Sequence, residues 1–157
     1  MRIVLSMILA ALLFSACKKN KFTTVPQIKF KSLKPETAPF NLPITSNPDS
    51  MPKLTVSITD LEGDIGFRAG VDTSRVYIKN LINNKVDSFF LPDINSAGVK
   101  NFEADLTVNL QSSLACKKNT PRPYSIDSNY YEVYVVDFAK NKSNVIKTEK
   151  PVLVRCF

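Results

Sequence analysis

The chain of 157 residues contains no histidine and no tryptophan, and it has only four glycines. Without histidine it cannot build a Ser-His-Asp or Cys-His catalytic group, and it cannot build a zinc site with imidazole ligands. Acid–base catalysis by carboxylates alone would need a buried pocket, which no pattern in the sequence indicates. We therefore expect that the protein is not an enzyme.

The chain has little acidic charge near its N-terminus, and this explains most of its net charge of +7. Residues 18–36 carry six lysines and one glutamate, whereas residues from 53 onward carry 14 Lys and Arg against 12 Asp and Glu. The excess charge therefore lies beside the N-terminus and not over a folded face. No arginine-rich helix or aromatic RNA-binding signature accompanies it, so we expect no nucleic-acid partner.

The first residues have the pattern of an export signal. Arg2 precedes the apolar run Ile3–Phe14, which only Ser6 interrupts. Twelve residues are too few to cross a hydrocarbon core of about 30 Å as a helix, but they are typical of a signal peptide. An ordinary cleavable signal is one interpretation of this segment.

The residues after the apolar run favour a second interpretation. Ser15 and Ala16 lead into Cys17, and this ending resembles the bacterial lipobox, although Phe14 stands where an aliphatic residue is usual. The resemblance implies a signal peptide over 1–16, a lipid on the Cys17 thiol, and a lipidated tether over 17–24. It places the protein in the bacterial cell envelope, on the periplasmic or surface face of the outer membrane, with the membrane as its partner.

The two other cysteines are Cys116 and Cys156. An even number of cysteines in an oxidising compartment favours one disulfide. In the chain-entropy model such a loop would stabilise the fold by about 4 kcal/mol. Two buried free thiols are the alternative.

The remaining chain alternates polar and apolar residues with the period of β-strands and shows no long helical period. We expect strands within 28–32, 54–59, 102–110, 130–138, 145–146 and 152–154, and a hairpin within 75–92 that turns at Asn83-Asn84. Residues 35–52 hold five prolines and predict an extended connection without strand pairing. Short strands at this spacing predict an all-β sandwich of about seven strands after an N-terminal signal helix.

Two short motifs carry a resemblance to a family. Asp137, Ala139, Asn141, Ser143 and Asn144 match a D-x-A-G-N-x-S-N turn, with Lys140 where glycine is common. The stretch TDLEGDIG resembles a D-x-D-G-D-x-G turn, with Glu62 in place of an aspartate. Both turns resemble those of immunoglobulin-like domains in Bacteroidota lipoproteins. The resemblance implies an immunoglobulin-like antiparallel β-sandwich over 25–157, in a family without an assigned function.

The glycine-containing loop has two interpretations. Gly63 and Gly66 would supply positive φ values for a reversing turn. The alternation of Asp60, Glu62 and Asp64, with Asp72 close by, would also suit a calcium ion, although the glycine spacing is not that of an EF-hand. The structural interpretation is favoured, with calcium as the one cofactor considered. A catalytic carboxylate pair is disfavoured because we expect an exposed turn, which does not raise a carboxylate pKa.

The sequence thus predicts a membrane-anchored, non-catalytic lipoprotein with a structural or binding β-sandwich. The alternative is a carbohydrate-binding accessory protein that uses an aromatic sheet face with the residues Tyr124, Tyr130, Tyr131 and Tyr134. Coplanar exposed rings would favour sugar binding, whereas buried rings would favour packing of the sheet.

Overall fold

The computed structural model describes residues 20–40, 48–66, 73–92, 99–117 and 125–156. The predicted signal segment 1–16 and Cys17 lie outside the described residues, and so do Asp72 and Tyr124. In the described part of the chain, no helix has the length and apolar character needed to cross a membrane.

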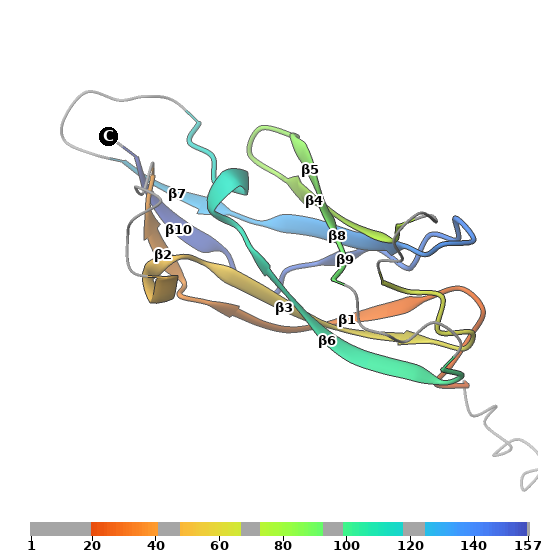
Figure 1. Ribbon diagram of the computed structural model, residues 1–157. Coiled ribbons are helices and arrows are strands. Elements are labelled where there is room, and N and C mark those ends of the chain that lie inside the picture. Colours follow the sequence, from red (N-terminus) through yellow and green to blue (C-terminus); the bar gives the residue numbers. More distant parts are fainter. Residues whose placement is uncertain (1–19, 41–47, 67–72, 93–98, 118–124, 157) are drawn as a thin grey trace, which may run out of the picture.

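The structure is all-β, as the alternating sequence pattern predicts (Figure 1). Its strands are β1 (Gln27–Lys34), β2 (Thr37–Pro39), β3 (Lys53–Asp60), β4 (Arg75–Asn80), β5 (Val86–Phe90), β6 (Phe102–Asn109), β7 (Ser125–Asn129), β8 (Tyr131–Val136), β9 (Ile146–Lys147) and β10 (Val152–Cys156). Two single-turn 3₁₀ helices, η1 (Pro48–Ser50) and η2 (Gln111–Ser113), accompany them.

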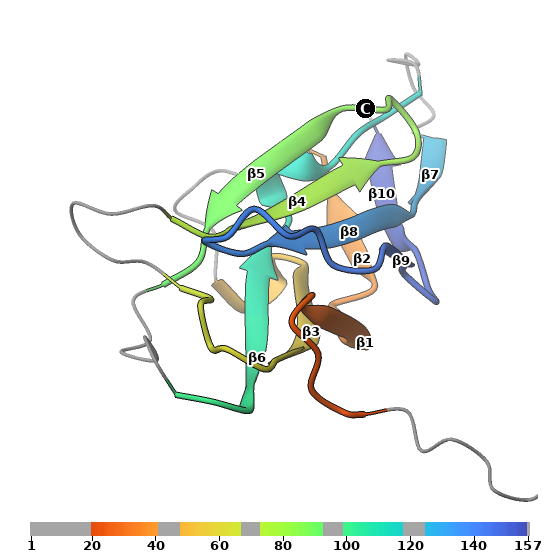
Figure 2. The ribbon, with the colours of Figure 1, turned by 90° about the vertical axis from the view of Figure 1, so that its right-hand side faces the viewer.

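The strands form two layers that pack face to face (Figures 1 and 2). One layer is the antiparallel sheet β1-β3-β6, and the other is the antiparallel sheet β5-β4-β8-β9. A third sheet, β2-β10-β7, continues the second layer, because β7 runs directly into β8 and β9 leads into β10. This strand order is that of an immunoglobulin-like sandwich.

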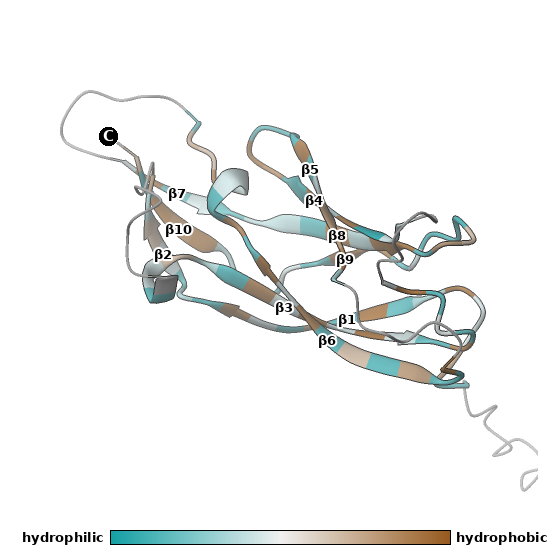
Figure 3. Cartoon of the chain, in the orientation of Figure 1, coloured by the Kyte–Doolittle hydropathy of each residue, from teal (hydrophilic) through white to brown (hydrophobic). Residues whose placement is uncertain are grey.

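The core lies between the layers, and the central strands β3, β4 and β8 contribute every second residue to it. Leu54, Val56 and Ile58 of β3 are buried, and the residues between them are half-buried. Tyr131, Val133 and Val135 of β8 follow the same period and belong to the same core. Figure 3 shows the resulting alternation of hydrophobic and hydrophilic residues along β6. Each such aliphatic side chain contributes about 1.5–3 kcal/mol to folding.

The described residues contain ten strands where about seven were expected, and two of them were not predicted. The prediction of an unpaired connection over 35–52 is wrong at β2, which pairs in parallel with β10 through Thr37–Pro39. Pro39 is tolerated because β2 lies at a sheet edge, where a missing N–H breaks no ladder. β7 was missed because its sequence, SIDSN, contains one apolar residue.

The hairpin over 75–92 is confirmed. β4 and β5 pair in antiparallel register, and Asn84 adopts a φ of 59° in the turn between them. Asn83 keeps a negative φ, and its Oδ1 accepts a hydrogen bond from the Lys85 N–H at 2.9 Å.

Candidate metal centre

The loop after β3 has the backbone geometry that its glycines predict. Gly63 has a φ of 67° and Gly66 a φ of 135°, both in the region that favours glycine. Asp60, the last residue of β3, accepts a hydrogen bond through Oδ2 from the Gly63 N–H at 2.7 Å. The structural interpretation of the loop is confirmed to this extent.

The turn after β8 is held by residues of the other motif, which spans 137–144. Asp137 accepts hydrogen bonds from the Asn141 N–H at 2.7 Å and from Asn141 Nδ2 at 2.9 Å. Lys140 adopts a φ of 69°, which lies in the left-handed region that favours glycine. Asn144 connects this turn to the other layer through two hydrogen bonds with Ile28 in β1. Its Oδ1 accepts from the Ile28 N–H, and its Nδ2 donates to the Ile28 carbonyl oxygen.

The two motifs meet at one end of the sandwich, the end opposite the C-terminus in Figure 1. The Phe138 N–H donates to the Asp64 carbonyl oxygen at 3.0 Å, and the Ala139 N–H donates to Asp64 Oδ2 at 3.3 Å. These contacts bring three carboxylates together. Asp60, Asp64 and Asp137 each place one oxygen within 4.8 Å of the others. We call this group the aspartate cluster.

Burial and the charge of Asp64 raise the pKa values of Asp60 and Asp137. Asp60 and Asp137 are both 0% exposed. Burial raises the pKa of Asp60 to about 6; the Gly63 N–H opposes this shift, and the charge of Asp64 adds to it. Burial also raises the pKa of Asp137, against the opposing hydrogen bonds from Asn141. The expectation of an exposed loop is therefore wrong, because the turn after β8 covers it.

Two carboxylate oxygens of the cluster have no hydrogen-bond partner. Asp60 Oδ1 and Asp64 Oδ1 are buried and accept no hydrogen bond. The ion pairs of six lysines are made with carboxylates outside the cluster; these are Lys21, Lys31, Lys53, Lys79, Lys85 and Lys150. A buried acceptor without a partner costs about 1–3 kcal/mol, and more when it is charged. Such oxygens are suited to receive a proton or a hard cation.

The cluster differs from the set of ligands predicted from sequence. Asp60 and Asp64 come together as predicted, but the Glu62 side chain is exposed and is not part of the group. Asp137 was missed as a candidate ligand because it lies 73 residues beyond Asp64 in the chain. The signal that could have found it is the presence of two acidic turn motifs in one sandwich, each directly after a core strand.

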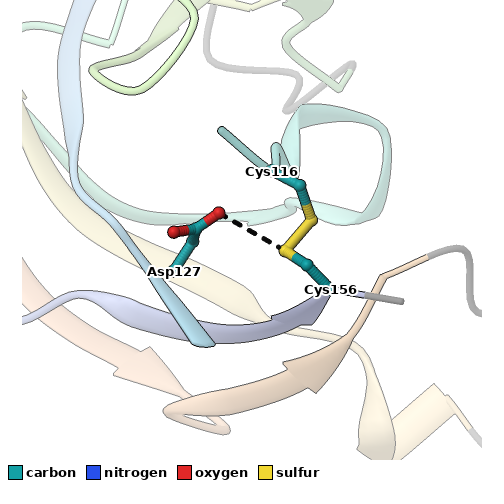
Figure 4. A group of neighbouring side chains, drawn as sticks. All are labelled: Cys116, Asp127 and Cys156. Atoms are coloured by element: carbon teal, nitrogen blue, oxygen red, sulfur yellow. Dashed lines mark hydrogen bonds between the residues drawn. A yellow bond between two sulfur atoms is a disulfide. The ribbon is translucent and has the colours of Figure 1, made fainter. Parts of the chain in front are cut away.

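A second group of potential ligands consists of Cys116, Asp127 and Cys156 (Figure 4). A disulfide joins the two cysteines, with a Cα–Cα distance of 5.9 Å. Asp127 Oδ2 lies 3.5 Å from Cys156 Sγ and accepts a hydrogen bond from the Lys117 N–H at 2.7 Å. Because the sulfurs are bonded to each other and not thiolates, this group is a covalent link and does not offer a metal site.

The described tyrosines do not form a flat platform. Tyr131 is fully buried. The rings of Tyr77 and Tyr134 stack on each other at 4.8 Å with an angle of 9° between planes, and Lys142 Nζ lies 4.0 Å from the centre of the Tyr134 ring. Lys147 lies over the Tyr130 ring. Contacts within the sheet already occupy these rings, and this arrangement favours packing over sugar binding.

Comparisons with known proteins do not extend this description. No protein-family model, curated protein or solved structure matches the chain.

Proposed function

We propose that the protein is an extracytoplasmic lipoprotein, anchored in a bacterial membrane through Cys17, whose immunoglobulin-like sandwich has a structural or binding role without catalysis. The observation that carries this proposal is the disulfide between Cys116 and Cys156. Structural disulfides persist in oxidising compartments such as the periplasm and the cell surface. The apolar N-terminal segment that ends at Cys17 supplies a route to such a compartment.

The first described residues support a short connection between anchor and domain. Lys21 pairs with Glu103 of β6, and the Thr23 carbonyl oxygen accepts a hydrogen bond from the Leu61 N–H at 3.1 Å. Three residues lie between Cys17 and Lys21, and the four Cα–Cα steps from one to the other reach at most about 14 Å. The sandwich would therefore lie close to the membrane surface, with the end that carries the aspartate cluster toward it. Lysines beside Cys17 would be attracted to anionic headgroups.

The test is incorporation of a fatty-acid probe in bacteria that express the full chain. The unmodified protein should take up the probe and partition with the membrane, whereas Cys17→Ser should take up none. The matched control is Cys116→Ser combined with Cys156→Ser, which removes the two cysteines of the sandwich but leaves Cys17, and this variant should still take up the probe. Labelling of the Cys17→Ser protein would contradict the anchor.

The compartment has a separate test. A thiol-alkylating reagent added under denaturing conditions should leave Cys116 and Cys156 unmodified in the exported protein, because they are bonded to each other. Deletion of residues 2–14 should keep the protein in the reducing cytoplasm, where both thiols would react. Two free thiols in the exported protein would contradict the proposal.

A further inference from the structure

The aspartate cluster carries an inference that does not depend on the lipid anchor. Three carboxylates with oxygens within 4.8 Å of one another belong to two layers of the sandwich, since Asp60 ends β3 and Asp137 follows β8. Asp60 is 0% exposed, and its Oδ1 has no hydrogen-bond partner. Asp64 Oδ1 is buried and unpartnered as well. We propose that Asp60, Asp64 and Asp137 bind one calcium ion that joins the loop after β3 to the turn after β8.

The existing hydrogen bonds leave one carboxylate oxygen of Asp60 and one of Asp64 available to contact such an ion. Asp60 uses Oδ2 for the Gly63 N–H, and Asp64 uses Oδ2 for the Ala139 N–H, so each retains Oδ1. Asp137 is held in place by two donors from Asn141, and a carboxylate oxygen can accept a donor and still contact a cation. The backbone bonds thus position the carboxylates before an ion arrives. A divalent cation would offset the repulsion among the three negative charges of the cluster.

The chemistry of the ligands favours calcium. All three side chains offer hard oxygen atoms, the chain has no histidine, and the two cysteines of the sandwich are bonded to each other. The oxygens of the cluster lie within 4.8 Å of one another, close enough to contact one ion at calcium–oxygen distances of about 2.4 Å. Magnesium dehydrates reluctantly and is rarely held by protein oxygens alone. Sites of extracellular modules bind calcium with a Kd of about 10⁻⁴–10⁻³ M.

The ion would connect the layers at the end of the sandwich opposite the disulfide. Cys156 lies at the end of β10 near the C-terminus, and the aspartate cluster lies at the far end of the strands (Figure 1). The loop also contacts the chain that precedes β1, because the Leu61 N–H donates to the Thr23 carbonyl oxygen. A calcium ion would therefore stabilise the end at which the chain enters the domain.

The test is thermal unfolding of the mature full-length protein in mild detergent, followed by far-UV circular dichroism. The melting temperature is compared in a calcium chelator, in millimolar calcium chloride and in millimolar magnesium chloride. Calcium at about ten times its Kd should raise the melting temperature by about 3–6 °C, because it binds only the folded state. Magnesium should produce a smaller rise.

The variants are Asp60→Asn and Asp137→Asn, since asparagine keeps an oxygen for the Gly63 or Asn141 N–H but loses the charge. Each should remove the calcium-dependent rise. In chelator each should melt at or above the temperature of the unmodified protein, because one repelling charge is gone, and this shows that the variant folds. The matched control is Glu62→Gln, which removes a negative charge from the same loop outside the cluster and should keep the full rise.

Three results would overturn the proposal. The first is identical melting of the unmodified protein in chelator and in calcium. The second is a calcium response that both aspartate variants retain, which would place the ion elsewhere. The third is an equal rise of the melting temperature in magnesium, which would show that the site does not prefer calcium. Fatty-acid labelling through Cys17 is unaffected by any of these results, so the two proposals can fail separately.

Discussion

Replacing Asn129 with alanine should be among the most damaging single substitutions in this protein. Asn129 ends β7 and is 0% exposed. Its Oδ1 accepts hydrogen bonds from Asn80 Nδ2 at 2.6 Å and from the Ala115 N–H at 2.9 Å, and its Nδ2 donates to the Ala115 carbonyl oxygen at 2.9 Å. One side chain thus joins β7, the end of β4 and the segment after η2.

The size of the effect follows from the groups left without a partner. Asn129→Ala removes the partners of the Ala115 N–H and C=O, and one of the two hydrogen bonds donated by Asn80 Nδ2, whose other acceptor is the Ser113 carbonyl oxygen. A buried polar group without a partner costs about 1–3 kcal/mol. Some relaxation will occur, so the free energy of unfolding should fall by about 4 kcal/mol. This is a large part of the stability of an ordinary domain.

The measurement is urea unfolding of the oxidised protein followed by circular dichroism. Ser128→Ala is the matched control, because Ser128 is the exposed neighbour in β7, and it should change the free energy of unfolding by less than about 0.5 kcal/mol. The double variant Asn80→Ala with Asn129→Ala should lose less than the sum of the single losses, because the two residues share a hydrogen bond. A loss below about 1 kcal/mol for Asn129→Ala, or strict additivity, would refute the reasoning.

Three further outcomes are expected in the same unfolding assay. Tyr131→Phe should stabilise the protein by up to about 1 kcal/mol, because the Tyr131 hydroxyl is buried without a hydrogen-bond partner; a clear loss of stability would contradict this. Gly66→Ala should cost about 1 kcal/mol or more, since the φ of 135° is unfavourable for alanine, and an unchanged midpoint would show that the loop adapts. Cys116→Ser with Cys156→Ser should cost about 4 kcal/mol, because the disulfide closes a loop with a sequence separation of 40; a cost near zero would argue against the chain-entropy model.

The sequence by itself determined the features that depend on neighbouring residues. The alternation in β3 and β6 predicted half-buried strands, because side chains in a strand point to opposite faces with a period of two. Gly63 and Gly66 predicted positive φ values, because the steric preference of a residue is local.

Features that depend on pairing between distant segments were decided by the tertiary structure. β2 and β7 lack a strong pattern of their own and become strands because β10 lies between them and bonds to both. In the sequence Asn129 does not differ from other polar residues. In the folded protein it is buried and hydrogen-bonded to Ala115.

The aspartate cluster shows the same division at the candidate site. The sequence indicated Asp60 and Asp64 as oxygen ligands from their spacing, and it added Glu62, which the turn leaves exposed and outside the cluster. Only the tertiary structure placed Asp137 beside them, because β3 and β8 lie in different layers and end at the same side of the sandwich. Burial between those layers removes water from Asp60 and raises its pKa, and no local pattern encodes that loss of solvent.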